Sequence, residues 1–355
     1  MRKLALPFVA TTCLALAALG CKSSAPAPSA ENKPAPEPTG PRVYATNEVS
    51  GDLTIIDIGT AQTITSVHLG KRPRGIHASA DGKQLYIALS GTPIAGPGVD
   101  ESTLPPPDHS ADGVAVFDLA ARKIVRTIPG GSDPENFDLS KDGKKLFISN
   151  EDISSVSIID VDSGTVEKTF KIGSEPEGVR VSPDGKEVWV TSEGTGEISV
   201  LDPEKGKITA TIKVGHRPRN VAFMPDGKTA YVNAENDGNI VVVDVKSHKM
   251  TKTITLGQAG VIKPMYVLLA PDASKLYVST GRGKQVFAID TKDNKIAGSV
   301  EVGARPWGMT LSPDGKTLFT ANGPSNDVSF VDLASFTVTK KAKAKGGPWG
   351  LVALP

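Results

Sequence analysis

Four loops of the sequence carry pairs of charged residues in one repeated setting. In each loop a glycine is followed two residues later by a charged residue, then by a proline and then by a second charged residue. The pairs are Arg72 and Arg74, Asp133 and Glu135, Glu175 and Glu177, and Arg217 and Arg219. Guanidinium and carboxylate groups form strong, charge-assisted hydrogen bonds with each other or with a charged ligand. The pattern therefore has two interpretations: ion pairs that fix neighbouring loops, or a binding site.

Three further loops of the same kind carry aromatic residues instead. They contribute Tyr266, Arg305 together with Trp307, and Trp349. Large aromatic side chains either pack between structural elements or stack against a ligand, and we leave both roles open for the two tryptophans. If all seven loops meet, one half of the shared surface is charged and the other is aromatic. Such a surface suits an amphipathic ligand or a peptide with a charged anchor.

Histidine and cysteine give little evidence for a metal site or a nucleophile. No two of the five histidines have the spacing of metal ligands, and both cysteines lie within the first 21 residues. We therefore predict neither a bound metal nor a cofactor.

Three polar residues occupy matching positions one step beyond the charged pairs: His77, Asp138 and Arg180. They could carry out acid–base chemistry or form a buried hydrogen-bonded cluster.

These loops belong to a repeat that begins near residue 42. Asp-Gly turns recur at Asp142, Asp184 and Asp226 with a spacing of 42 residues, and short runs of alternating apolar and polar residues separate them. A period near 42 is typical of a four-stranded propeller blade. The interval from Asp81 to Asp142 is longer because of an insert at about 91–110. We predict an all-β fold, a seven-bladed β-propeller of four-stranded blades over residues 42–355.

The seventh blade is split between the two ends of the chain. Its first strand lies at 349–354, and its other three strands lie at 43–47, 53–57 and 63–67. Pairing the C-terminal strand with the N-terminal strands closes the ring and protects the strand edges. In such a ring the charged and aromatic loops converge on one mouth of the central channel, and the insert lies there too.

The first 41 residues have the composition of an export signal followed by a tether. Residues 1–20 are predicted to be a signal peptide, with Arg2 and Lys3 before an apolar run. Cys21 after Gly20 resembles the bacterial lipobox, which implies a lipidated Cys21. Residues 22–41 are rich in proline and hold no large apolar residue, so we expect a semi-extended tether. We predict a lipid-anchored protein of the bacterial cell envelope, on the outer membrane facing the periplasm.

Several sequence segments resemble a known group of propellers. Tyr44-Ala45-Thr46-Asn47 and Ser182-Pro183-Asp184-Gly185-Lys186 resemble the YVTN-type bacterial seven-bladed propellers, and there is no Gly-His…Trp-Asp pattern of the WD repeat. Segments such as Asn150-Glu151-Asp152 and Pro348-Trp349-Gly350 resemble the propellers associated with PQQ-dependent catabolism. That resemblance implies a companion of periplasmic quinoprotein dehydrogenases with no assigned reaction. The lipobox and the insert depart from that pattern.

Three functions compete. We favour a monomeric binding module, not an enzyme, that holds a periplasmic protein, peptide or small molecule at the mouth. The first alternative is a hydrolase of the lactonase type, in which a channel residue such as His77 or Asp138 would act, with a metal. The second is single-stranded DNA binding. Loss of Arg2 and Lys3 changes the formal charge from +1 to −1, which argues against nucleic acid because backbone binding needs a positive track.

Overall fold

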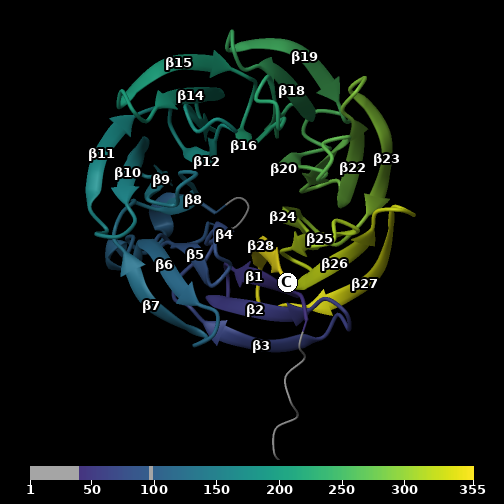
Figure 1. Cartoon of the computed structure of the whole chain (residues 1–355), viewed down its shortest axis with the longest axis horizontal. Helices are drawn as coiled ribbons and strands as arrows, with labels where there is room; N and C mark the ends of the chain where they lie inside the picture. The colour runs from purple at the N-terminus through teal and green to yellow at the C-terminus, as the bar shows by residue number, and fades with distance from the viewer. Residues whose placement is uncertain (1–39, 96–98) are drawn as a thin grey trace, which may run out of the picture. The chain divides into compact units, whose positions relative to one another are not determined.

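The computed structural model describes residues 40–95 and 99–355, which form seven four-stranded antiparallel sheets arranged in a ring (Figure 1). The predicted all-β seven-bladed propeller is therefore confirmed. The predicted signal peptide, Cys21 and most of the predicted tether lie outside the described residues. Among the described residues, no helix has the length and apolar character that crossing a membrane requires.

We number the blades from the sheet that contains both ends of the ring. Each blade contains four strands, named in order from the channel outwards. Blade 1 consists of β28 (Pro348–Leu354), β1 (Arg42–Asn47), β2 (Asp52–Asp57) and β3 (Thr63–His68). Blade 2 consists of β4 (Ile76–Ala78), β5 (Gln84–Leu89), β6 (Gly113–Asp118) and β7 (Lys123–Ile128). Blade 3 consists of β8 (Pro134–Leu139), β9 (Lys145–Asn150), β10 (Ser155–Asp160) and β11 (Val166–Lys171). Blade 4 consists of β12 (Pro176–Val181), β13 (Val188–Ser192), β14 (Glu197–Asp202) and β15 (Lys207–Lys213).

The remaining three blades follow the same plan. Blade 5 consists of β16 (Pro218–Phe223), β17 (Thr229–Ala234), β18 (Asn239–Asp244) and β19 (Lys249–Thr255). Blade 6 consists of β20 (Pro264–Leu269), β21 (Lys275–Thr280), β22 (Gln285–Asp290) and β23 (Lys295–Glu301). Blade 7 consists of β24 (Pro306–Leu311), β25 (Thr317–Asn322), β26 (Asp327–Asp332) and β27 (Thr337–Lys343).

Blade 1 closes the ring as the sequence predicted. The C-terminal strand β28 pairs antiparallel with β1, with Val352 opposite Tyr44 and Leu351 opposite Ala45. The chain thus supplies the innermost strand of its first sheet from its last residues. Because the two ends of the repeat region pair within one sheet, the ring is closed and every blade packs between two others.

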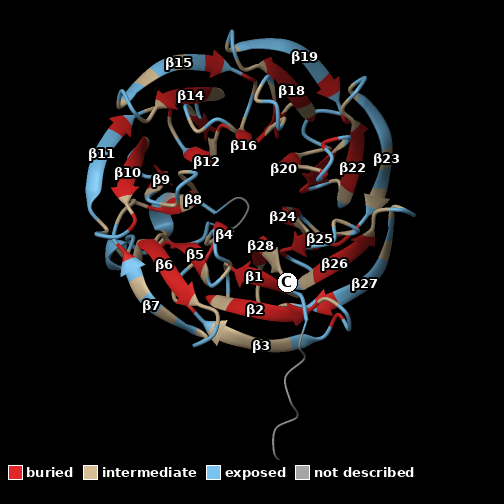
Figure 2. Ribbon diagram, viewed as in Figure 1, coloured by how far each residue is buried: buried red, intermediate tan, exposed pale blue. Residues whose placement is uncertain are grey.

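The hydrophobic core lies between the blades. Seven clusters of buried side chains each join residues of two adjacent blades; Tyr231 of blade 5 and Leu276 of blade 6, for example, belong to one of them. The second and third strands of each blade are almost fully buried, whereas outer strands such as β11 and β19 are largely exposed (Figure 2). Burial thus falls towards the outer edge of each blade, where polar residues alternate along the fourth strand.

The first strands approach one another closely around the channel. A Cβ atom on Gly178 of β12 would lie 2.1 Å from the carbonyl oxygen of Arg219, and one on Gly308 of β24 would lie 2.7 Å from that of Trp349. Only glycine fits at such a distance. These glycines therefore seat Arg219 and Trp349 of the next blade at the mouth.

The insert is the one long connection between a second and a third strand. It leaves β5 after Leu89 and joins β6 at Gly113, and it contains two 3₁₀ turns, η1 (Glu101–Thr103) and η2 (His109–Ala111). The equivalent loop of blade 4 spans only residues 193–196. The connection between β5 and β6 contains the segment predicted as an insert, at about 91–110.

Candidate active site

The charged loops turn sharply into the first strands of their blades. The residue before the proline has a positive φ in five blades, with values of 40°, 50°, 51°, 56° and 48° for Arg72, Asp133, Glu175, Arg217 and Arg305. Non-glycine residues seldom adopt this conformation. The second residue of each loop, two positions further on, lies at or near the start of the first strand. Each loop thus contributes an outer and an inner side chain to the mouth.

The inner residue of blade 5, Arg219, binds three carboxylates. Its Nη1 lies 2.5 Å from Glu177 Oε2 and 2.6 Å from Glu193 Oε1, and its Nε lies 2.5 Å from Glu235 Oε2. Arg217 also pairs with Glu193 and lies 3.4 Å from Glu235. We call Arg219, Glu177, Glu193 and Glu235 the Arg219 cluster. It joins blades 4 and 5 at the mouth.

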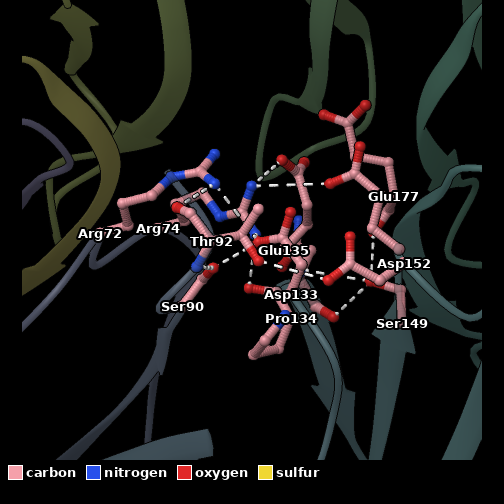
Figure 3. A network of polar contacts seen from close by, with 12 residues as sticks. Arg72, Arg74, Ser90, Thr92, Asp133, Pro134, Glu135, Ser149, Asp152 and Glu177 are labelled. Carbon is pink, nitrogen blue, oxygen red and sulfur yellow. Dashed lines mark hydrogen bonds and ion pairs between the residues drawn. The ribbon is translucent and has the colours of Figure 1, made fainter. Parts of the chain in front are cut away.

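A second cluster centres on Arg74 of blade 2 (Figure 3). Its guanidinium donates to the carboxylates of Asp133 and Glu135 and to the carbonyl oxygen of Pro134, the last at 2.9 Å. Arg72 binds Glu48 at 3.0 Å and approaches Asp133 at 3.5 Å. We call Arg74, Asp133 and Glu135 the Arg74 cluster. It joins blades 2 and 3.

These contacts give a structural role to several residues for which the sequence predicted ligand binding. The Arg74 side chain is 0% exposed and Glu177 is buried against Arg219, so neither presents a free group to a ligand. Their ion pairs cross from blade to blade, as the structural interpretation of the sequence predicts. A buried charge needs such a partner because it has lost its hydration. Arg74, Asp133, Glu135, Glu177 and Arg219 therefore fix the geometry of the mouth.

A second set of acids at the mouth was missed in the sequence. Each follows directly after the second strand of a blade: Glu48, Glu151, Glu193 and Glu235. Three of them recur with the 42-residue period of the repeat, so the signal was present in the sequence. Of the four, only Glu151 belongs to a segment with a family resemblance, Asn150-Glu151-Asp152, and the predicted site was confined to the loops between fourth and first strands and to three channel residues.

Two of these glutamates have opposite protonation behaviour. Burial and the neighbouring Glu135 raise the pKa of the Glu151 carboxyl to about 9, against the attraction of Arg74, whose Nη1 lies 3.7 Å away. Burial would also raise the pKa of Glu235, but Arg219, Arg217 and Lys263 lower it to about 2. Glu151 therefore carries a proton at neutral pH although 32% of its side chain is exposed. A carboxylic acid that keeps its proton and reaches solvent can donate it.

The aromatic half of the mouth is built around Trp307. Its ring stacks on that of Trp349 in the next blade at 5.6 Å and 25°. The guanidinium carbons of Arg219 and Arg305 lie 5.0 and 4.8 Å from the Trp307 ring. The two tryptophans thus pack against each other between blades 7 and 1, and Trp307 also holds two cations by cation–π contact.

Arg305 differs from the other arginines of the mouth. No carboxylate of the described residues lies within 4.0 Å of it, and its side chain is exposed. Burial of the surrounding loop and the nearby Arg219 lower the pKa of Arg305 from its usual value, as expected for a cation without an acidic partner. Contact with the Trp307 ring positions the Arg305 guanidinium, and its five N–H donors remain available to an anion.

Two further predicted site residues do not line the mouth cavity. Tyr266 stands at the position of Gly308 in blade 7, one residue beyond the inner loop position, and its hydroxyl lies 3.5 Å from Arg180 Nη2 in the channel. The longer loop of blade 6 obscured this register in the sequence. Glu175 is exposed and does not line the mouth cavity. Neither residue belongs to the aromatic–charged surface predicted for them.

The channel cluster is held together more loosely. Arg180 Nη1 lies 3.9 Å from Asp138 Oδ2, and the Asp138 carboxylate accepts the backbone N–H groups of Leu139 and Val181 at 2.9 and 2.8 Å. His77 packs against Phe137 with ring centroids 4.9 Å apart, and burial lowers the pKa of its imidazole. The structure brings the three predicted residues to one side of the channel, where Asp138 serves to join strands of blades 3 and 4.

The other four histidines each face one carboxylate: Asp52, Asp112, Asp237 and Glu187 for His68, His109, His216 and His248. In residues 40–95 and 99–355, no three His, Cys, Asp or Glu side chains are grouped as a metal site requires.

The mouth encloses a cavity of about 430 Å³ between the clusters, the aromatic pair and the insert. Its lining includes the proton-bearing Glu151, the neighbouring Asp152 and the cation Arg305. Asp152 accepts only hydroxyl donors, Thr92 Oγ1 at 3.3 Å and Ser132 Oγ at 3.4 Å, and no cation of the described residues lies within 4.0 Å of it. The cavity thus brings together a carboxyl with a raised pKa, a carboxyl without an ionic partner within 4.0 Å and a guanidinium without a carboxylate partner within 4.0 Å.

A comparison of the sequence with family models finds one match. The model described as "Lactonase, 7-bladed beta-propeller" matches residues 35–182 and 173–334. Together the two matches cover most of the chain and all but the closing part of the ring.

Similar proteins share the fold at low sequence identity. The periplasmic gluconolactonase PpgL of Pseudomonas aeruginosa superposes with a TM-score of 0.71 at 20% identity, covering 89% of this chain and 99% of that one. The hydrazine synthase of Kuenenia stuttgartiensis gives a TM-score of 0.68 at 20% identity, covering 82% and 92%. Antigen Lp49 of Leptospira interrogans is 29% identical over 143 residues, which is 32% of this chain and only 31% of that protein. These likenesses show a common architecture.

Proposed function

Because the chain belongs to the lactonase family of seven-bladed β-propellers, we propose that it is a hydrolase that opens lactones at the channel mouth. This proposal takes the place of the binding module that the sequence favoured. The family match and the gluconolactonase among its structural neighbours support hydrolysis more than ligand capture alone. The site is the cavity at the mouth.

Lactone hydrolysis needs three groups, and the cavity holds one candidate for each. Water attacks the carbonyl carbon, the bond from that carbon to the ring oxygen breaks, and the product is an open hydroxy acid. The Asp152 carboxylate takes a proton from the attacking water, as a general base does. Arg305 stabilises the negative charge that develops on the carbonyl oxygen. Glu151 donates its proton to the departing ring oxygen.

The proton balance closes between the two neighbouring acids. After one turnover Asp152 holds the proton of the water and Glu151 has lost its own. The next turnover requires that the proton return to Glu151, either directly or through solvent. The observation that carries the proposal is the raised pKa of Glu151, about 9, in a carboxyl that lines the same cavity as Arg305. A carboxyl that holds its proton near neutral pH can act as the acid.

The test is a lactonase assay on purified protein. We expect hydrolysis of at least one member of a panel of γ- and δ-lactones, followed by proton release in a pH-stat. Glu151→Gln should lower kcat by about 10²-fold or more, as expected for loss of a general acid. Glu204→Gln, an exposed glutamate in the turn between β14 and β15, is the matched control and should match the wild type. A wild-type rate equal to that of buffer over the whole panel would exclude the proposal and favour the binding module.

We also propose that the protein works in the bacterial cell envelope. The support is the lipobox-like Cys21 after an export signal in the sequence. Growth with an alkyne fatty acid should label the wild-type chain and leave Cys21→Ser unlabelled. Equal labelling of the two chains would contradict lipidation at Cys21.

A further inference from the structure

The insert of blade 2 takes no part in the chemistry described above, yet it forms one side of the same cavity. Pro93, Ile94, Leu104 and Pro105 of the insert line the cavity together with Trp307. No other blade has an equivalent segment, since the other loops between second and third strands are short. The insert therefore adds an apolar wall to a mouth that the ring alone would leave open.

The base of the insert is fixed in place by specific contacts. Gly91 N donates to Asp112 Oδ1 at 2.7 Å, and Asp108 N donates to the Gly91 carbonyl at 3.1 Å. Lys71 Nζ lies 2.6 Å from Asp108 Oδ2, and Arg72 Nη1 donates to the Thr92 carbonyl at 2.8 Å. Through these contacts the wall beside Ile94 is held against the loop that begins blade 2.

The same base touches the proposed catalytic loop. Thr92 Oγ1 donates to Asp152 at 3.3 Å (Figure 3), and Arg72 connects Thr92 to Glu48. Pro93 and Ile94 follow Thr92 directly and therefore start close to Asp152. A substrate whose carbonyl lies at Asp152 would extend any substituent along the insert.

The polar groups of the cavity leave few donors for a hydroxylated substrate. Arg72, Arg217 and Arg219 are each held by carboxylates, and those carboxylates are occupied by the same arginines. Of the lactone-binding groups proposed above, Asp152 and Arg305 have no ionic partner within 4.0 Å among the described residues, and Glu151 lies 3.7 Å from Arg74. A polyhydroxylated ring would lose hydrogen bonds to water and find few replacements in this cavity.

Thr92 apart, the remaining lining residues are apolar and most are only partly covered, and apolar atoms form the smaller part of the cavity surface. Ile94 is 40% exposed, and Trp307 is half-buried. An alkyl chain placed between the insert and Trp307 would remove this surface from water, which favours binding in proportion to the apolar area buried.

We propose that the insert is a specificity element that selects lactones whose ring carries an alkyl substituent over polyhydroxylated sugar lactones. The inference rests on the proposed lactonase function and assigns the substrate class of that site. The lactone ring lies at Glu151, Asp152 and Arg305, and the alkyl chain lies along Ile94 and Leu104.

The test is a substrate series at fixed pH. We expect kcat/KM to rise roughly threefold to fourfold per added methylene from γ-butyrolactone through γ-hexalactone to γ-octalactone, and to be lowest for δ-gluconolactone. In Ile94→Asn and Leu104→Ser, the ratio of kcat/KM for γ-octalactone to that for γ-butyrolactone should fall at least fivefold. Ile296→Asn on the outer strand β23 is the matched control, because Ile296 is 42% exposed and lies outside the cavity. Its ratio should equal that of the wild type.

The outcomes separate the two proposals. A wild type that prefers δ-gluconolactone, or one whose kcat/KM does not change with alkyl length, overturns the role of the insert and leaves the lactonase function in place. The same holds if both insert variants keep the wild-type ratio while their melting curves match the wild type. If no lactone is hydrolysed at all, both proposals fail.

Discussion

Blades 3 and 5 place a glutamate at the same point of the repeat, and the two residues behave in opposite ways. Glu151 and Glu235 each follow the second strand of their blade. The pKa of Glu151 is raised to about 9 by burial and Glu135, whereas cations lower that of Glu235 to about 2. The repeat sets the position of each carboxyl, and contacts with the neighbouring blade set its protonation state. A ring of similar loops can thereby hold carboxyls whose pKa is raised by burial, such as Glu151 and Glu177, beside a carboxylate whose pKa is lowered by cations, such as Glu235.

We expect the largest loss of stability from removing Arg219, the cation that Glu177, Glu193 and Glu235 share. Arg219→Met would leave Glu177, Glu193 and Glu235 without their shared partner in a buried site. Removing one member of a buried ion pair costs about 3–5 kcal/mol, and urea unfolding should show a loss of stability of that size. Arg305→Met removes an exposed arginine beside the same tryptophan, and we expect a loss below about 1 kcal/mol from its cation–π contact. Equal losses in the two variants would refute the distinction between a structural and a free arginine.

The next prediction concerns catalytic activity. Here Arg305, which contributes little to stability, should matter most. Arg305→Met should reduce kcat/KM for the preferred lactone by about 10²-fold, the usual result of removing one donor that stabilises an oxyanion. Arg122→Met is the control, because Arg122 has a similar backbone φ of 52° and lies in the turn between β6 and β7, at the end of the blade opposite the mouth. A rate for Arg305→Met equal to that of the control would remove Arg305 from the mechanism.

The comparison also predicts a difference in the pH dependence of stability. Folded Glu151 keeps its proton up to about pH 9, whereas the unfolded chain loses it near its ordinary pKa of 4.5. Stability is lost as pH rises through this window, because the folded state binds the extra proton. Glu151→Gln lacks this group, so its Tm should fall less than that of the wild type between pH 5 and pH 9.

Glu235 should give the opposite dependence. Its folded pKa of about 2 lies below the ordinary value of 4.5, so its stabilising contribution is complete above pH 4.5 and disappears as pH falls towards 2. The difference in Tm between the wild type and Glu235→Gln should therefore shrink on acidification. Parallel curves for the two glutamine variants would show that the neighbouring blades do not set the two pKa values.

The sequence was sufficient to predict the ring and its closure. Regular turns and a split seventh unit imply a closed ring, and the pairing of Val352 with Tyr44 confirms it. Loops at equal positions in the repeat also predicted contacts between neighbouring blades, such as those of Arg74 with Glu135 and of Arg219 with Glu177. These properties follow from local turns and from the period, which the sequence carries directly.

The chemistry of the mouth could not be predicted in the same way. The 42-residue spacing places Glu151 and Glu235 at one level, but nothing local to either residue shows that Glu235 faces three cations whereas Glu151 faces several acids and one cation, Arg74. Tyr266 was misplaced because its loop is longer than the others, which shifts the register by an amount that only strand pairing reveals. Protonation depends on contacts between blades, and those contacts exist only in the closed ring.

The pH dependence of kcat/KM for the preferred lactone, corrected for spontaneous hydrolysis, tests the central claim most directly. If Glu151 is the proton donor, wild-type kcat/KM should fall as pH rises through about 9, the pKa of this carboxyl. Glu151→Gln should retain a low rate with no fall in that range. A wild-type profile that stays level through pH 9, or a Glu151→Gln variant with the wild-type profile, would contradict the account.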